Sequence, residues 1–350
     1  MHSRNKWKPY LLPLLLSIVL TLSFKGIYAG NIKFISDTVS LEKPYIIVAT
    51  NRPYQFDSLT NEYFPNQISQ EQSLTYLKVF RNGDNWLVVP LKVIPDFESN
   101  TNGYSDWLVY VHGDSQTPDL AFTRGFQLQS EYQVNVIVFS WPSKDPDLGG
   151  LQNFKNSKNL IEKGAPDFVE FVQQLDSWKK INTSGQNINL SLFLHSLGNY
   201  YLERLVTDSI LQGINHKIFE NVVLNAAAVN QKNHHVWLEK INFQERIFVN
   251  SNSKDMTLKG VSLFTNGDTQ LGEKAMGDFA SNANYINFSQ ALDKEMNFGL
   301  LHGYYVGVIP GKYPNIYKYY RAIFHGQPVE FSSPEMFVQN DSIPVFEIIN

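Results

Sequence analysis

The chain has 350 residues, of which 43% are hydrophobic, 18% are charged and 14% are aromatic. This composition is typical of a folded globular protein and excludes a disordered or fibrous chain. The formal net charge of -4 gives no sign of the basic face that nucleic-acid-binding proteins carry, so we expect no nucleic-acid partner. Because the sequence contains no cysteine, disulfides, thiolate metal sites and a cysteine nucleophile are excluded.

The N-terminal segment has the order of a secretory signal. Basic residues precede an apolar run from Leu11 to Phe24, and the small residues Ala29 and Gly30 follow. The run is shorter than the roughly 20 residues of a bilayer-spanning helix. We therefore predict a signal peptide over residues 1–29, cleaved near Ala29, and a secreted or periplasmic protein in which residues 30–350 form a single domain. An uncleaved segment that keeps the protein near a membrane is the alternative.

After this segment, strands and helices alternate along the chain. Apolar runs bounded by turn residues predict strands at 44–51, 86–94, 106–113, 134–141, 188–195, 219–229, 245–252 and 284–289. Helical spacing of apolar residues predicts helices at 117–132, 165–180, 199–212 and 313–324. This alternation favours the α/β class, with a mostly parallel central sheet and helices on both faces. Functional groups in such sheets gather at the carboxyl ends of the strands.

The stretch LFLHSLGNY, residues 192–200, places a serine at one of these strand ends. A tight turn over Ser196–Gly198, followed by a helix, would expose the serine hydroxyl above the sheet. Gly198 has no Cβ to meet the strand from which the chain turns away. Leu194, however, stands where the G-x-S-x-G pattern has a glycine. On this stretch alone, an activated nucleophile and an ordinary strand-end serine both remain open.

An activated serine needs a base, and the base needs an acid that orients it. For a serine on such a turn the chain order is serine, acid, histidine. Asp255 follows the strand predicted at 245–252, and His302 follows the last predicted strand, so these two complete the order with Ser196. Asp268 is the rival acid, and Asp278 is a weaker one.

A tetrahedral oxyanion needs two backbone N–H donors. We assign one to Leu197, which follows the serine, and the other to Asp114, or to Ser115 beside it, in the loop after the strand 106–113. A plain strand-ending turn at this loop is the alternative. The adjacent His234 and His235 point apart and have no third ligand at a suitable spacing, so we interpret them as surface residues of a polar loop. We predict no metal and no cofactor.

Several short motifs resemble, in order, those of a family of bacterial α/β-hydrolase-fold proteins of unknown function. The matching stretches are VATNRP at 48–53, VFSWPSKD at 138–145, LHSLGN at 194–199, DMTL at 255–258 and HGYY at 302–305. The stretch VHGD at 111–114 departs from the family, which has phenylalanine where Asp114 stands. The resemblance implies an α/β-hydrolase fold with Ser196 as nucleophile, Asp255 as acid and His302 as base.

Such a protein would be a serine hydrolase that acts through an acyl-enzyme on a small-molecule or lipid carboxylic ester, with no protein partner. An amidase or acyltransferase with the same triad is one alternative, and an inactive binding or envelope protein on the same scaffold is another. The segments 55–72 and 145–163 would be packed surface loops, or would cover the cleft.

Overall fold

The computed structural model describes residues 31–35, 44–53, 64–70, 74–91, 93–94, 103–182, 188–208, 214, 216–265, 267–293 and 296–350. The predicted signal peptide and most of segment 55–72 lie outside these residues. Within the described part of the chain, no helix is both long enough and apolar enough to cross a membrane.

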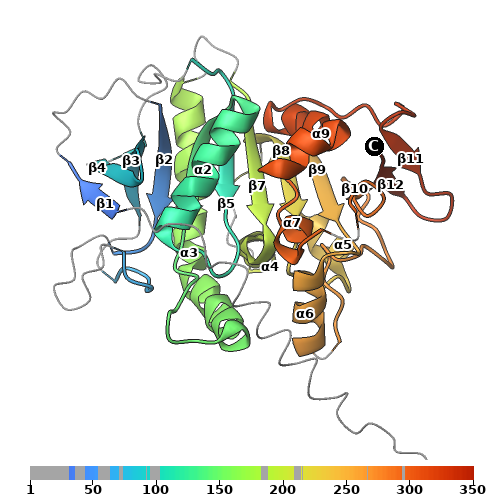
Figure 1. Ribbon diagram of the computed structural model, residues 1–350, viewed down its shortest axis with the longest axis horizontal. Helices are drawn as coiled ribbons and strands as arrows, with labels where there is room; N and C mark the ends of the chain where they lie inside the picture. The colour runs from blue at the N-terminus through green and yellow to red at the C-terminus, as the bar shows by residue number, and fades with distance from the viewer. Residues whose placement is uncertain are drawn as a thin grey trace, which may run out of the picture.

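A 12-stranded sheet runs through the molecule, in the order β1-β4-β3-β2-β6-β5-β7-β8-β9-β10-β12-β11 (Figure 1). The strands are β1 (Asn31–Phe34), β2 (Tyr45–Thr50), β3 (Thr75–Asn82), β4 (Asn85–Leu91), β5 (Trp107–Val111), β6 (Asn135–Ser140), β7 (Leu190–His195), β8 (Phe219–Asn225), β9 (Gln244–Ser251), β10 (Ala283–Asn287), β11 (Phe337–Gln339) and β12 (Val345–Ile348). From β2 through β6, β5, β7, β8, β9 and β10 to β12, all neighbours are parallel. Next to β2, β3 and β4 form an antiparallel hairpin, and β11 is antiparallel to β12. The predicted α/β class with a mostly parallel sheet is confirmed.

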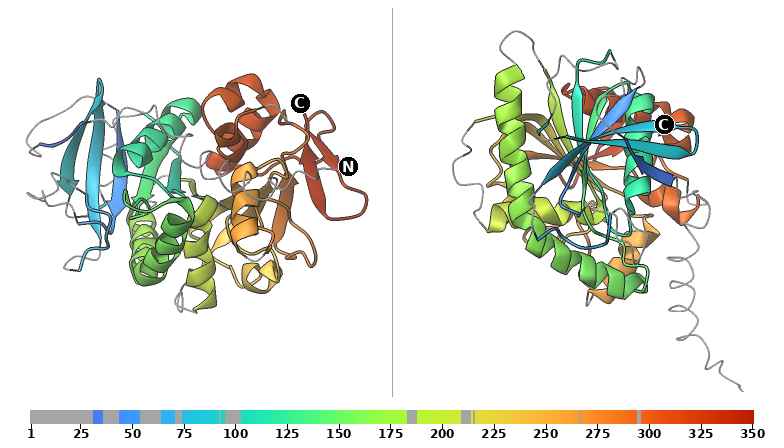
Figure 2. Two further views of the ribbon diagram at one scale, coloured as in Figure 1. Left: turned by 60° about the horizontal axis from the view of Figure 1, so that its bottom comes forward. Right: turned by 90° about the vertical axis from the view of Figure 1, so that its left-hand side faces the viewer.

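Helices cover both faces of this sheet. They are α2 (Pro118–Tyr132), α3 (Gly150–Asn182), α4 (Asn199–Thr207), α5 (His234–Leu238), α6 (Met256–Phe264), α7 (Phe298–His302), α8 (Val308–Lys312) and α9 (Pro314–Phe324), with a short 3-10 helix η2 (Ser196–Gly198). The right-hand view of Figure 2 shows α2 and α9 on one face and α3 and α4 on the other. Every residue of β5, β6 and β7 is buried, because these central strands are covered on both sides.

Helix α3 differs from the sequence prediction. It begins at Gly150 rather than at Ala165, so most of segment 145–163, for which we expected a packed surface loop or a cover over the cleft, is helical. Pro166 lies inside the helix, where it cannot donate to the carbonyl group four residues earlier. Figure 2 shows that the helix bends between its two halves. The second half packs against the sheet, whereas the first half reaches the carboxyl ends of the strands.

Candidate active site

The chain reverses sharply at the end of β7. His195 is still extended, with φ -112° and ψ 135°, whereas Ser196 has φ 53° and begins η2. For a residue other than glycine, this left-handed conformation costs roughly 1–2 kcal/mol. Helix α4 begins directly after η2, at Asn199. The strand, turn and helix predicted around Ser196 are therefore all present.

Two features allow this turn despite Leu194. A Cβ on Gly198 would lie 2.6 Å from the carbonyl oxygen of His112 and 2.9 Å from that of Val111, so the turn packs directly onto the end of β5. Leu194 itself is fully buried as a regular residue of β7, paired with Val111 and Leu224. A large residue two positions before the serine thus fits into the core and leaves the turn intact.

The Asn199 side chain holds the turn in place. Its Nδ2 donates to the carbonyl oxygen of Ser196 at 2.9 Å and to that of Leu194 at 3.1 Å. The backbone N–H of Ala228 also donates to the Ser196 carbonyl, at 3.1 Å. The motif LHSLGN contains Asn199, but sequence reasoning gave it no role. These bonds offset part of the cost of the strained serine.

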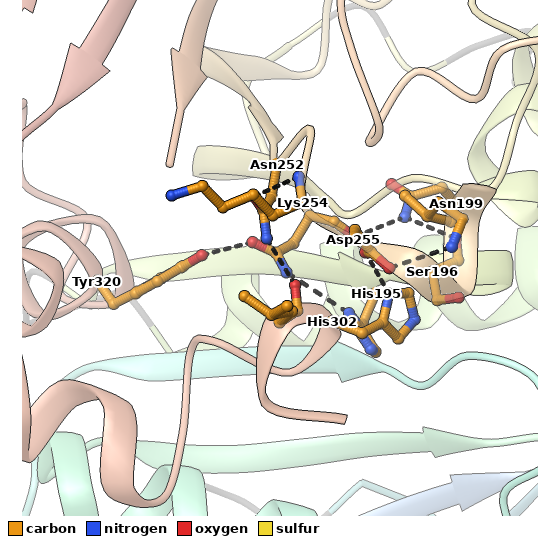
Figure 3. Close-up of polar contacts among 11 residues, drawn as sticks. His195, Ser196, Asn199, Asn252, Lys254, Asp255, His302 and Tyr320 are labelled. Carbon is orange, nitrogen blue, oxygen red and sulfur yellow. Dashed lines mark hydrogen bonds and ion pairs between the residues drawn. The ribbon is translucent and has the colours of Figure 1, made fainter. Parts of the chain in front are cut away.

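Asp255 and His302, which are 47 residues apart in sequence, form a direct hydrogen bond (Figure 3). Nδ1 of His302 lies 2.6 Å from Oδ2 of Asp255, and the other carboxylate oxygen accepts the N–H of Leu258 at 3.1 Å. The Asp255 side chain is fully buried and that of His302 is 15% exposed. Because the carboxylate engages Nδ1–H, the second ring nitrogen, Nε2, is left to accept a proton.

This pair lies beside the serine turn. The ring of His302 packs on the ring of His195, with centroids 4.6 Å apart, and His195 directly precedes Ser196. The rival acids Asp268 and Asp278 are exposed. Within the described residues, the acid bonded to His302 is Asp255.

Asn252 joins the two segments that carry the acid and the histidine. Its Nδ2 donates to the carbonyl oxygen of Leu301 at 2.8 Å, one residue before His302. Its own carbonyl accepts the N–H of Asp255 at 3.0 Å, and its Oδ1 accepts the N–H of Lys254 at 3.0 Å. Sequence reasoning did not identify this residue, because an asparagine after a strand has the ordinary appearance of a turn.

The loop after β5 packs against the serine. A Cβ on Gly113 would lie 2.7 Å from Cβ of Ser196 and 3.3 Å from its Oγ. Leu197 is the second residue of η2, so its N–H has no partner within that helix. Among the described residues, the structure records no hydrogen bond donated by the N–H of Asp114. The two N–H groups predicted as oxyanion donors thus belong to residues next to Ser196 and next to Gly113.

A neutral His112 supports this loop. The N–H of Trp141 donates to Nε2 of His112 at 3.1 Å, so Nδ1 carries the proton and donates to the carbonyl oxygen of Gly113 at 2.9 Å. The two rings stack, with centroids 5.3 Å apart. The pKa of His112 is lowered to about 3, mainly by burial; the hydrogen bond to the Gly113 carbonyl opposes this shift and the nearby Arg52 guanidinium adds to it. His112 therefore acts as an uncharged structural residue.

Further contacts connect this loop to distant motifs. The buried Arg52 donates to the carbonyl oxygens of Trp141 at 2.6 Å and Gln116 at 3.1 Å. The Asp114 carboxylate accepts Nδ2 of Asn153, in α3, at 2.8 Å and the hydroxyl of Ser115 at 3.2 Å. Burial raises the pKa of the Asp114 carboxyl. The stretches VATNRP and VFSWPSKD thus meet around the loop that carries Gly113.

The interpretation of His234 as a surface residue is wrong. His234 is fully buried in α5, with Nε2 2.8 Å from the hydroxyl of Tyr285 and Nδ1 2.6 Å from the carbonyl oxygen of Gln231. It packs as a core residue because both ring nitrogens have partners. In the described ranges, no group of three or more histidine, aspartate or glutamate side chains is placed to hold a metal.

A pocket with about 490 Å³ of empty space, part of it open to solvent, lies above Ser196. Its lining residues are Asp114, Gly150, Leu151, Phe154, Ser196, Thr257, Gly260, Val261 and Phe264. They come from the loop after β5, the start of α3, the serine turn and α6. The serine hydroxyl therefore faces a predominantly apolar pocket at the carboxyl edge of the sheet, where ligands bind in α/β proteins.

Comparison with known proteins places this architecture in a family. A family model described as an alpha/beta hydrolase of unknown function (DUF900) matches residues 97–296, which is more than half of the chain. The matched range contains Ser196 and Asp255 and ends before His302. A search of curated proteins finds no match.

Two solved structures show a distant likeness. Phospholipase PlaB from Legionella pneumophila in complex with thio-NAD has 13% identity and a TM-score of 0.31, over 70% of this chain and 67% of that chain. Another structure of phospholipase PlaB from Legionella pneumophila has 12% identity and a TM-score of 0.25, over 57% of this chain and 42% of that chain. At these values, neither likeness bears on the activity of this chain.

Proposed function

Because the chain belongs to the family of alpha/beta hydrolases of unknown function, we propose that this hydrolase uses Ser196 as its nucleophile, His302 as its base and Asp255 as the acid that orients the base. The proposed reaction is the hydrolysis of a carboxylic ester through an acyl-enzyme. Ester cleavage needs no further chemical group, because the triad and the oxyanion donors supply proton transfer and charge stabilisation.

In the proposed first step, Oγ of Ser196 attacks the ester carbonyl carbon while Nε2 of His302 takes the hydroxyl proton. The developing oxyanion accepts hydrogen bonds from the N–H groups of Leu197 and Asp114. The intermediate collapses when His302 returns the proton to the leaving alcohol. A water molecule, deprotonated by His302, then attacks the acyl-enzyme, and collapse of the second intermediate releases the acid and restores Ser196.

The observation that carries this proposal is the 2.6 Å bond between His302 and Asp255, formed beside a serine whose φ is 53°. A strained non-glycine residue persists only where the surrounding structure holds it, and such residues cluster at active sites. A buried carboxylate that fixes one nitrogen of a partly exposed histidine leaves the other available for proton transfer.

Turnover of p-nitrophenyl butyrate by the purified protein and its variants tests the proposal. Ser196→Ala and His302→Gln should each lower kcat on the order of 10³-fold or more, since each removes a group that takes part in bond-making. His216→Gln is the matched control: His216 also bonds an aspartate, with Nε2 2.6 Å from Oδ1 of Asp176, but on the surface. Turnover that survives in Ser196→Ala would exclude Ser196 as the nucleophile.

We also propose that the enzyme works outside the cytoplasm after removal of residues 1–29, on the strength of the N-terminal sequence. Sequencing of the N-terminus of protein recovered from cells tests this. Gly30 as the first residue agrees with the proposal, whereas a retained segment 1–29 contradicts it.

A further inference from the structure

The pocket above Ser196 is a trough between single faces of two helices. On α6, the lining residues Thr257, Gly260, Val261 and Phe264 follow the helical spacing of three and four that places side chains on one face. On α3, Gly150, Leu151 and Phe154 lie on the first turns. Figure 1 shows α6 and the first half of α3 beyond the carboxyl ends of the strands. Two helix faces therefore form most of the lining, and Asp114 and Ser196 complete it.

The trough is suited to an aliphatic group rather than to a charged one. Apart from Asp114, Ser196 and Thr257, its lining residues are glycine or apolar, and none of the nine is a lysine, arginine or histidine. The Asp114 carboxylate already accepts hydrogen bonds from Asn153 and Ser115. An anionic group placed here would find no cation among the described lining residues and would meet this carboxyl, at a large desolvation cost.

The position of His302 indicates which half of the ester enters the trough. The histidine that protonates the leaving alcohol must be within hydrogen-bond reach of it. His302 is not among the residues that line the trough. Asp114, whose N–H is assigned to the oxyanion, is one of them. The acyl group, which stays bonded to the carbonyl carbon, therefore points into the trough, and the alcohol leaves on the His302 side.

We propose that the trough between α3 and α6 is an acyl-chain site and that the substrates are esters of uncharged aliphatic acids. This inference rests on the proposed function of Ser196. Burial of each additional methylene should raise kcat/KM by about fourfold until the trough is filled. Gly150 and Gly260 have no side chains that would narrow the space between the two walls.

The test compares p-nitrophenyl acetate, butyrate and octanoate in wild type and in variants that narrow the trough from either side. Leu151→Trp acts on the α3 wall and Val261→Trp on the α6 wall. Each should lower kcat/KM for octanoate at least tenfold and change that for acetate less than threefold. Leu263→Trp is the matched control on α6, because Leu263 is 63% exposed and does not line the trough. In this variant, kcat/KM should depend on acyl-chain length as it does in wild type.

Phe154→Ala widens the trough instead of narrowing it. It therefore tests the acyl-chain site even if the fold does not accommodate a tryptophan at Leu151 or Val261. It should shift the preference toward chains longer than that preferred by wild type. A flat chain-length profile in active wild type, or unchanged profiles in Leu151→Trp, Val261→Trp and Phe154→Ala, would overturn the acyl-chain site and leave the role of Ser196 standing. Absence of turnover and of fluorophosphonate labelling in folded wild type would instead reject the proposed function, and this inference with it.

Discussion

Gly113 and Ser196 follow the ends of strands β5 and β7, and they are so close that a Cβ on Gly113 would lie 2.7 Å from the Cβ of Ser196. Real Cβ atoms do not approach this closely, so the loop after β5 can reach the serine only because residue 113 is glycine. The added Cβ on Gly113 would also lie 3.2 Å from the carbonyl oxygen of His195. Any side chain at this position must push the loop away from the serine or rotate the serine itself.

We therefore expect Gly113→Ala to lower kcat on the order of 10²-fold, because a displacement of about 1 Å at reacting groups has that effect. Strain at the packed turn should also cost about 1–3 kcal/mol of unfolding free energy. Kinetics with p-nitrophenyl butyrate and thermal unfolding measure both. Gly311→Ala is the control, since a Cβ there has no neighbour within 4 Å. Wild-type kcat in Gly113→Ala would show that the loop is not part of the site.

Asp255→Asn tests the acid. The asparagine keeps the volume and an acceptor for the N–H of Leu258 but lacks the charge that holds Nδ1–H of His302. A drop in kcat on the order of 10³- to 10⁴-fold is expected, as for the same exchange in other serine triads. Asp268→Asn, at the exposed rival acid, should leave kcat unchanged. The reverse result, with Asp268→Asn inactive and Asp255→Asn active, would reassign the acid.

His112 should make the protein less stable in acid. Its folded-state pKa of about 3 lies below the ordinary value of 6.5, so the unfolded chain binds a proton more readily between these two values. Stability attributable to neutral His112 is therefore present above pH 6.5 and is lost as the pH falls toward 3, at up to about 1.4 kcal/mol per pH unit. In denaturant unfolding from pH 8 to pH 4, the free energy of unfolding of wild type should fall more steeply with pH than that of His112→Gln. Parallel curves would contradict a neutral, buried His112.

His325 should have the opposite effect. Its Nδ1 lies 2.6 Å from Oδ2 of Asp106 and its Nε2 lies 2.8 Å from the carbonyl oxygen of Tyr132. Both partners accept, so both ring nitrogens carry protons, and the Asp106 hydrogen bond raises the pKa of His325 against the effect of burial. The charged ring should contribute roughly 1.5–3 kcal/mol below pH 6.5, and this is lost as the pH rises through the raised pKa.

The measurement is the unfolding free energy of wild type and of His325→Gln across pH 5 to pH 9. The difference between the two should be largest at the acid end and should shrink as the pH rises. A difference that stays constant over this range would mean that the folded and unfolded chains bind a proton at His325 equally well, and it would contradict the raised pKa of His325.

The central strands and the serine turn could be predicted from the sequence because their patterns are local. β5 is a continuous apolar run and β7 is largely apolar, both are buried throughout, and Gly198 marks the turn directly. β3 was not predicted because it is a partly exposed strand in an antiparallel hairpin, and its run TYLKVFRN mixes apolar with charged residues. The first half of α3 was not predicted either, because a proline such as Pro166 is typical of the first position of a helix and not of its interior.

In the candidate active site, too, only the residues that belong to a sequence pattern could be predicted. Asp255 and His302 could be proposed from chain order and from the family resemblance, and they are in contact. Asn199 and Asn252 could not, because their roles depend on which carbonyl groups the folded chain brings to their side-chain amides. The apolar trough was also missed, since its two walls, on α3 and α6, are about 100 residues apart in sequence and α6 was not predicted at all.

The most direct test of the account is mass spectrometry of the intact, folded protein after reaction with a fluorophosphonate, followed by peptide mapping. We predict one covalent adduct, located on Ser196, and no adduct in Ser196→Ala. His302→Gln should react far more slowly, because no base then takes the serine proton. An unmodified wild-type protein, or an adduct on a different serine, would contradict the assignment of Ser196 as an activated nucleophile.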